Sequence, residues 1–207
     1  MFEIFESKFV RDSASSDHGK PQESVVPASF GLHHFFERYA GNAFNNGLYR
    51  VVSLQTGEMA SLFIRTAHPN LAERLQCFAF DWLGSLFCLD SGRMEKGAMG
   101  VLMLEPGTGQ ALKIPSNLAS FHDEMLIQNA DAALGAGFYQ DWLSEGGQPP
   151  RFDQCIGYKK PLFLGGVDTV ENLEVTDLDV YWTISAQLIH KVKGLPPGTK
   201  IGKVSSQ

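Results

Sequence analysis

Acidic side chains gather in one stretch near the C-terminal end of the sequence. Asp168, Glu171, Glu174, Asp177 and Asp179 place five carboxylates within twelve residues that contain no Lys or Arg. Such a segment is either a solvated face or an electrostatic docking patch for a basic protein. Asp177 and Asp179 also suit the positive end of a helix that follows them. From this stretch we predict partner binding at Asp168, Glu171, Glu174 and Asp177.

A second candidate is the pair Asp81-Trp82, which puts a carboxylate and an indole into an otherwise apolar stretch just before Leu83-Gly84. The carboxylate of Asp81 is suited to accept hydrogen bonds from the main-chain N–H groups of a turn. The alternative is that Asp81 and Trp82 line a pocket for a small ligand or a partner, close to the turn at Gly165-Gly166.

The residue types that usually carry catalysis or bind metal form no recognised set. The six His and three Cys residues show no zinc-ligand spacing, and the sequence has neither a G-x-S-x-G nucleophile elbow nor a P-loop. Cys77, Cys88 and Cys155 each lie in an apolar segment, where buried, reduced thiols are expected. We therefore expect no enzyme activity, no bound metal and no cofactor.

Composition and charge limit the class of partner. Hydrophobic residues make up 43% of the chain and charged residues 19%, as in soluble globular proteins. The net charge is −6 and no basic run occurs, which argues against direct nucleic-acid binding and suits a basic protein partner. Without a signal-peptide pattern or an 18-residue apolar run, a cytoplasmic protein with no membrane segment is expected. The sequence gives no indication of oligomeric state.

These residues must be positioned by an α+β fold. Hydrophobic periodicity predicts helices over 30–39 and 56–67, and strands over 48–52, 76–82, 86–89, 100–104 and 111–114. A helix that starts near Pro115-Ser116-Asn117 and a second helical region over 130–143 follow. The order predicts a central antiparallel sheet built from consecutive hairpins and packed against N-terminal and C-terminal helices.

The C-terminal part has the sharpest pattern. The apolar run Tyr158–Gly166 predicts a buried strand that ends in a glycine turn. Thr176 and Asp179 form a T-x-x-D version of the capping box, which predicts a helix from Thr176 to a C′ residue at Gly194. Its predicted buried face consists of Leu178, Tyr181, Trp182, Ile184, Leu188, Ile189 and Val192.

The chain divides into three parts on these patterns. Residues 1–29 are interpreted as an N-terminal arm and flexible loop, residues 30–195 as a single globular α+β domain, and residues 196–207 as a C-terminal tail. The apolar residues Phe2, Ile4, Phe5 and Phe9 predict a short helix or strand that docks on the domain. The segment Asp12–Ser24 lacks large apolar residues and predicts an exposed loop.

Three segments resemble a bacterial family called domain of unknown function 1851, which forms the C-terminal part of a type VI secretion DNase-immunity protein. They are Gly41–Arg50 (GNAFNNGLYR), Asp81–Gly84 (DWLG) with the strand to Asp90, and Tyr158–Gly166 (YKKPLFLGG) continuing to Trp182. The resemblance extends from Phe30 to Val192. The layout is also similar to the wider SUKH superfamily of toxin-immunity and regulatory proteins.

This resemblance implies a cytoplasmic protein that binds a cognate toxin, expected to be basic and here a DNase, and blocks it. The family has no agreed catalytic residues, so none is assigned. Because immunity surfaces vary with the toxin, the resemblance implies a scaffold role for Tyr158–Gly166. A small-ligand-binding domain and a regulatory SUKH-like module without a toxin remain open as alternatives.

Overall fold

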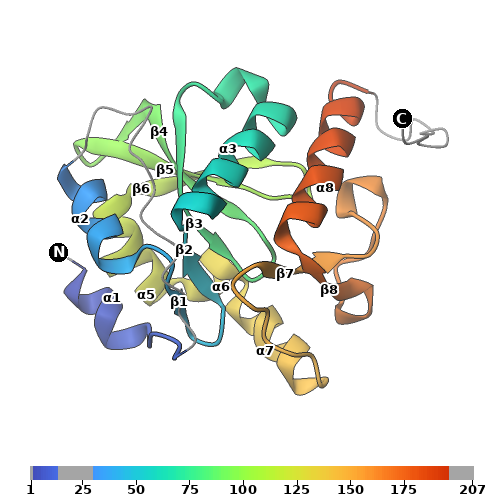
Figure 1. The fold of residues 1–207 in the computed structure, drawn as a ribbon, viewed down its shortest axis with the longest axis horizontal. Coiled ribbons are helices and arrows are strands. Elements are labelled where there is room, and N and C mark those ends of the chain that lie inside the picture. Colours follow the sequence, from blue (N-terminus) through green and yellow to red (C-terminus); the bar gives the residue numbers. More distant parts are fainter. Residues whose placement is uncertain (1, 14–29, 196–207) are drawn as a thin grey trace.

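Six antiparallel strands follow one another across a sheet at the centre of the molecule (Figure 1). The computed structural model describes residues 2–13 and 30–195. The strands are β1 (Ala43–Phe44), β2 (Tyr49–Val51), β3 (Leu75–Asp81), β4 (Leu86–Glu95), β5 (Ala98–Leu104) and β6 (Ala111–Asn117), paired in chain order. The predicted fold class, an antiparallel sheet of consecutive hairpins with helices packed on it, is confirmed.

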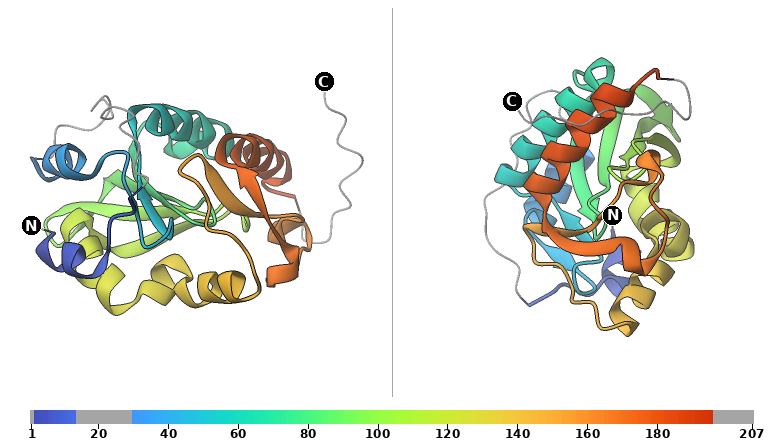
Figure 2. Two further views of the ribbon diagram at one scale, coloured as in Figure 1. Left: turned by 60° about the horizontal axis from the view of Figure 1, so that its bottom comes forward. Right: turned by 90° about the vertical axis from the view of Figure 1, so that its right-hand side faces the viewer.

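Helices cover both faces of this sheet (Figure 2). On one face, α3 (Leu54–Ala67) and α8 (Leu178–Val192) lie side by side, and the Phe63 and Trp182 rings stack with centroids 5.7 Å apart. The other face is covered by α4 (Leu118–Ser120), the π-helical turn Phe121–Met125, α5 (Leu126–Gln128), α6 (Ala130–Leu134) and α7 (Ala136–Ser144). Strands β3 and β4 are apolar on both faces near their turn because both faces are covered.

The N-terminal helix α1 (Glu3–Lys8) docks on the core, as its phenylalanine pattern predicts, beside α2 (Phe30–Tyr39). The buried Phe2 and Phe5 rings lie 5.3 and 5.0 Å from the ring of His122. The Asp123 carboxylate accepts hydrogen bonds from the main-chain N–H groups of Phe2 and Phe5 at 2.9 and 3.1 Å. These N–H groups have no partner inside the helix, so Asp123 acts as a long-range cap.

The structure describes only part of the three segments into which the sequence was divided. Residues 14–29 and 196–207 lie outside the described residues, and with them most of the predicted loop Asp12–Ser24 and the predicted tail. Asp12 itself is ordered against the body, because its carboxylate accepts hydrogen bonds from the N–H groups of Asn46 and Gly47, each at 2.8 Å. The boundaries at residues 29 and 196 therefore stay predictions.

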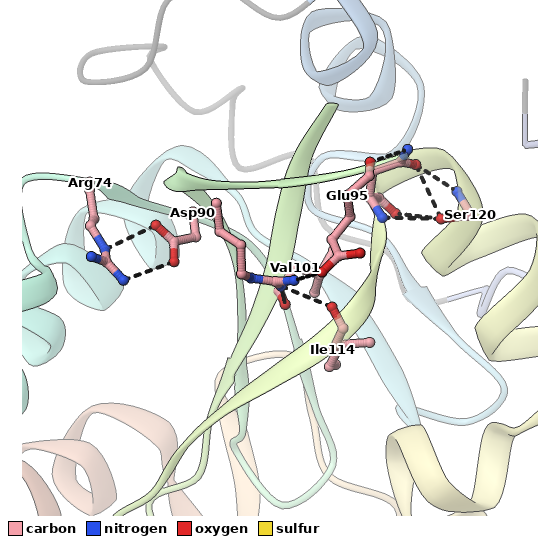
Figure 3. Close-up of polar contacts among 8 residues, drawn as sticks. Arg74, Asp90, Glu95, Val101, Ile114 and Ser120 are labelled. Carbon is pink, nitrogen blue, oxygen red and sulfur yellow. Dashed lines mark hydrogen bonds and ion pairs between the residues drawn. The ribbon is translucent and has the colours of Figure 1, made fainter. Parts of the chain in front are cut away.

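Arginine side chains fasten the strands at β4 and β5 (Figure 3). Asp90 at the end of the buried part of β4 is fully buried, and Nε and Nη2 of Arg74 each lie 3.0 Å from one of its oxygens. Arg93 donates to the main-chain oxygens of Val101 and Ile114, the latter at 2.9 Å, and pairs with Glu95. These charges are paired with one another or with strand carbonyls, so this cluster has a structural role.

The prediction of a strand over Tyr158–Gly166 is wrong beyond Tyr158. Strand β7 (Gln154–Tyr158) ends there, and Leu162–Leu164 forms a 3₁₀ turn. Pro161 has no N–H group to donate to a ladder, which stops the strand. Gly166 then approaches the chain so closely that a Cβ would lie 1.9 Å from the Lys160 carbonyl oxygen. The glycine pair thus closes a tight loop rather than a strand.

The start of the C-terminal helix is also shifted. Thr176 belongs to β8 (Leu173–Asp177), where it faces Cys155 of β7, so Asp177 rather than Thr176 is the N-cap and the predicted capping box does not form. Ile184 was expected to be buried but is 54% exposed, while Ser185 is buried instead. Gly194 follows the C-cap with φ of 82°, which confirms its role as the C′ residue.

Candidate functional site

A cavity of about 510 Å³ opens beside the β3–β4 turn, the β5–β6 turn, the α6–α7 segment and the loop after β7. Its volume lies within the roughly 300–1,000 Å³ range of ligand pockets. The lining contains five carboxylates and no Lys, Arg or His; these carboxylates are Asp81, Glu105, Asp131, Asp141 and Asp168. We call this cavity the acidic pocket.

Asp81 is the buried carboxylate of the acidic pocket, with 2% of its surface exposed. Its Oδ1 accepts a hydrogen bond from the Ser85 N–H group at 2.8 Å, so it caps the β3–β4 turn as the sequence suggests. Burial raises the pKa of Asp81 to about 7, against the lowering effects of the Ser85 hydrogen bonds and the Arg50 charge. Among the ion pairs of the described residues, none includes Asp81.

A fully buried arginine lies behind Asp81 and fixes its main chain. Arg50 Nη2 donates to the main-chain oxygen of Asp81 at 2.5 Å, and Nη1 donates to the main-chain oxygens of Arg151, at 3.0 Å, and Gln154. The guanidinium carbon lies 4.5 Å from the centroid of the Phe80 ring. Burial lowers the pKa of Arg50 to about 10. Because Arg50 is directed at carbonyl groups, it leaves the Asp81 carboxylate without an ion-pair partner.

Three of the other four pocket carboxylates accept hydrogen bonds from neutral donors. The Thr108 hydroxyl donates to Glu105 at 2.7 Å, the Gly137 N–H group donates to Asp131 at 2.8 Å, and the Tyr158 hydroxyl donates to Asp168 at 2.6 Å. Asp131, Asp141 and Asp168 are exposed, whereas Asp81 is buried. The pocket therefore has an acidic floor and an acidic rim, oriented without being neutralised.

Trp82 does not line this cavity. Its side chain is fully buried, Nε1 donates to the main-chain oxygen of Leu134 at 2.8 Å, and its ring lies 5.6 and 4.8 Å from the rings of Phe138 and Tyr139. Trp82 thus positions α6 and α7, which carry part of the pocket wall. The structure separates the predicted pair: Asp81 reaches the cavity and Trp82 supports the wall behind it.

The predicted docking residues lie along one exposed strip. Asp168 follows the Leu162–Leu164 turn, Glu171 lies in the 3₁₀ turn Val170–Asn172, and Glu174 and Asp177 lie on β8; all four side chains are exposed. We call these four residues the acidic ribbon. Asp168 belongs to both the ribbon and the acidic pocket. Lys159 donates to the main-chain oxygen of Glu171 at 2.8 Å, so one cation lies beside the ribbon in the fold. Partner binding by the ribbon stays a prediction.

Metal chemistry finds no support in the part of the chain that the structure describes, where no group of three or more His, Cys, Asp or Glu side chains is arranged to hold an ion. The three cysteines are free and buried, and Cys77 faces Cys88 across the β3–β4 ladder. Among residues 2–13 and 30–195, no helix is long and apolar enough to cross a membrane.

Three pocket carboxylates escaped the sequence interpretation. Glu105 lies between the strands predicted over 100–104 and 111–114, and Asp131 and Asp141 lie in the helical region predicted over 130–143; none of the three was a candidate. Each is brought to Asp81 by contacts between elements far apart in the chain, which no local pattern reports. Two of the five carboxylates were candidates from the sequence: Asp81 as a turn cap or pocket residue, and Asp168 as part of the acidic docking patch.

Comparisons with known proteins found a family model and a solved structure to which the chain is similar. Residues 116–189 match the family model described as T6SS immunity protein Tdi1, C-terminal, where T6SS denotes type VI secretion. Among solved structures, the chain is similar to the crystal structure of Atu4351 from Agrobacterium tumefaciens, with a TM-score of 0.52 and 14% identity over 90% of this chain and 89% of that one. At this identity the likeness concerns the fold alone. No curated protein matches the sequence.

The family match covers about a third of the chain, within its C-terminal half, and includes most of the candidate site. It includes Asp131, Asp141 and Tyr158 of the pocket wall and the whole acidic ribbon, but not Asp81 or Glu105. The match supports a type VI secretion immunity domain and an immunity-protein role, which implies binding of a cognate toxin.

Proposed function

We propose that this protein is a cytoplasmic immunity protein that binds a cognate type VI secretion toxin, a DNase, and blocks it. The observation that carries the proposal is the match of residues 116–189 to an immunity-protein family. The resemblance of Gly41–Arg50, Asp81–Gly84 and Tyr158–Gly166 to the family called domain of unknown function 1851, near the SUKH superfamily, points to the same role.

Electrostatics favour a basic toxin surface as the binding partner. A DNase must attract phosphates, so its substrate-binding surface is rich in Lys and Arg. The net charge of −6 and the exposed carboxylates of the acidic ribbon complement such a surface. Complementary charge speeds encounter and selects the partner, while a few buried contacts supply most of the affinity.

The test is co-expression with the protein encoded next to the gene, which the proposal expects to be a secreted nuclease. We expect the two proteins to copurify as a stable complex, and cells that express the nuclease to survive only when this protein is present. If no neighbouring toxin is captured or neutralised, the immunity role is wrong.

The role of the ribbon is tested separately, with Glu171→Gln, Glu174→Gln and Asp177→Asn combined in one variant. We expect the association rate with the toxin to fall about tenfold at low salt, because steering depends on exposed charge. The matched control combines Glu3→Gln, Glu58→Gln and Glu73→Gln, which also removes three exposed carboxylates but lies on other elements. If both variants lower the association rate equally, the ribbon contributes only through the net charge of the protein.

The pocket favours one alternative function, a module that binds a small ligand with no toxin partner. A cavity of about 510 Å³ with polar and apolar walls is large enough for a metabolite. Mass spectrometry of the purified, denatured protein distinguishes the two functions. A stoichiometric small molecule released from the wild type but absent from a variant with an altered pocket would favour the alternative.

A further inference from the structure

The unusual feature of the acidic pocket is that negative charge is concentrated there and nothing in the described chain neutralises it. Five carboxylates line it without a Lys, Arg or His. Charged side chains are rarely buried unless they are paired, yet Asp81 at the floor is 2% exposed and takes part in none of the ion pairs of the described residues. A buried carboxylate that opens on a cavity, while the arginine behind it donates to main-chain carbonyls and forms no ion pair with it, points to a cation that enters from outside.

The carboxylates are arranged to receive that cation before it arrives. Thr108, Gly137 and Tyr158 hold Glu105, Asp131 and Asp168 through hydrogen bonds of 2.6–2.8 Å. The Ser85 N–H group holds Asp81 in the same way. Because neutral donors orient these groups, their charge stays available, and little ordering remains to be done when a cation binds.

The shape and lining favour an organic cation over a metal ion. No group of three or more His, Cys, Asp or Glu side chains in the described part of the chain is arranged to hold a metal ion. The walls add the partly exposed rings of Tyr158 and Phe138 and the apolar side chains of Leu83 and Leu162. A guanidinium group satisfies both features, because it binds carboxylates through a planar fork of donors and stacks on aromatic rings.

We propose that the acidic pocket receives an arginine side chain of the toxin, with Asp81 at the floor and Asp168 at the rim as its acceptors. This inference rests on the immunity role proposed above and names the contact that would anchor the complex. The acidic ribbon would meet the basic surface around that arginine, since Asp168 joins the two features. An arginine from the substrate-binding surface of a DNase could not bind DNA phosphates while it occupied the pocket. The same contact would therefore contribute to inhibition.

The pocket chemistry is testable on the free protein without the toxin. The ¹⁵N-labelled full chain is titrated at pH 8 with N-acetyl-arginine methylamide and, as a neutral isostere, N-acetyl-citrulline methylamide. We expect saturable shifts at the amides of Ser85, Gly107 and Gly135 with the arginine probe only, and their loss in Asp81→Asn. Equal shifts with the citrulline probe, no saturation with the arginine probe, or tighter binding of spermidine would overturn the guanidinium assignment.

The toxin contact is tested with the purified complex. Asp81→Asn keeps an oxygen that can accept from the Ser85 N–H group but removes the charge, and we expect it to weaken toxin binding about 30-fold or more through faster dissociation. Glu145→Gln, an exposed carboxylate outside the pocket lining, is the control and should leave affinity unchanged. Native melting curves of the free variants show whether each remains folded.

The outcomes separate the two proposals. If the toxin is captured but Asp81→Asn binds it as tightly as the wild type, the pocket contact is wrong and the immunity role stands. If the arginine probe binds but no toxin is captured, the toxin is not the source of the arginine and the immunity role fails, while the chemistry of the pocket stands.

Discussion

Asp81 is a carboxylate that the fold buries, although burial disfavours its charged form. Its side chain is buried, its pKa is raised to about 7, and the nearest buried cation, Arg50, is directed at main-chain carbonyls. A stabilising residue would be neutral or paired at this position. Residues that cost stability while facing a cavity are characteristic of functional sites, and this is the physical argument for Asp81 as a binding residue.

The stability cost of Asp81 is measurable. The pKa of Asp81 in the folded protein, about 7, lies above its ordinary value of 3.8. This group therefore stabilises the fold fully below pH 3.8, and that contribution is lost as pH rises through 7. Asp81→Asn should therefore raise the free energy of unfolding at pH 8 by about 2–4 kcal/mol. At pH 5 the gain in the free energy of unfolding should be less than half of the gain at pH 8.

Urea denaturation at pH 8 and pH 5 checks this expectation, with the exposed Asp141→Asn as a control that should change little at either pH. A gain of the same size at both pH values would show that Asp81 is already ionised at little cost. If Asp81→Asn is more stable but binds its partner less tightly, Asp81 lowers the stability of the fold and contributes to binding.

His122 provides a second pH dependence, in the opposite direction. Its ring lies among the aromatic side chains of α1 and α2, 2.8 Å from the Tyr49 hydroxyl and 2.7 Å from the Leu118 main-chain oxygen. Burial lowers the pKa of His122 from 6.5 to about 4. The unfolded chain then binds more protons between pH 6.5 and 4, so stability should fall by about 3 kcal/mol as pH drops through this window.

The ¹³Cε1 chemical shift of His122 checks this directly, because the ring should stay neutral down to about pH 5. A titration midpoint near the ordinary value of 6.5 would contradict it. Acid should also loosen α1, because Phe2 and Phe5 pack on this ring.

Among the elements, Arg50 adds side-chain hydrogen bonds between parts of the chain that are far apart in the sequence. It joins β2 to the end of β3 through Asp81 and to the segment before β7 through Arg151 and Gln154. The hydrogen bond from Arg50 holds the main chain of Asp81 and so fixes the floor of the acidic pocket.

Arg50→Lys should therefore be costly despite retaining the charge. A lysine has no planar fork to reach three carbonyl groups and cannot stack on Phe80 in the same way, so a loss of about 2–4 kcal/mol in the free energy of unfolding is expected. The same substitution at Arg151, whose side chain is 70% exposed, should change stability by less than about 0.5 kcal/mol. Chemical denaturation of both variants measures the difference, and similar losses would show that the carbonyl contacts of Arg50 contribute little.

Elements that local patterns define were predicted well. Helix α2 spans Phe30–Tyr39 as expected, and α3 ends at Ala67 before His68-Pro69. The failures occur where tertiary pairing competes with a local signal. Thr176 has the sequence environment of an N-cap, but β8 pairs it with Cys155, and Tyr158–Gly166 has the composition of a strand, but Pro161 stops the ladder.

At the scale of the whole molecule, charge should govern how the protein meets its partner. Exposed carboxylates on the ribbon and the pocket rim act over about 8 Å at physiological ionic strength and much less at higher salt. The association rate with the captured toxin should therefore fall about tenfold between 50 mM and 500 mM salt, whereas the dissociation rate should change far less.

Stopped-flow mixing at several salt concentrations measures both rates. The combined variant of Glu171, Glu174 and Asp177 should show a flatter salt dependence than the wild type. A salt dependence that is unchanged in this variant would place the steering charges elsewhere on the surface.

The sequence by itself determined the class of fold, the order of hairpins and helices, the turn-capping role of Asp81 and the acidic character of Asp168–Asp177. These follow from periodicity, turn chemistry and charge, which act between residues close in the chain. Only the tertiary structure decided that Asp81, Glu105, Asp131, Asp141 and Asp168 share one cavity and that Trp82 lies behind its wall. That convergence depends on packing between distant elements, where side-chain volume and the need to satisfy buried polar groups select the arrangement.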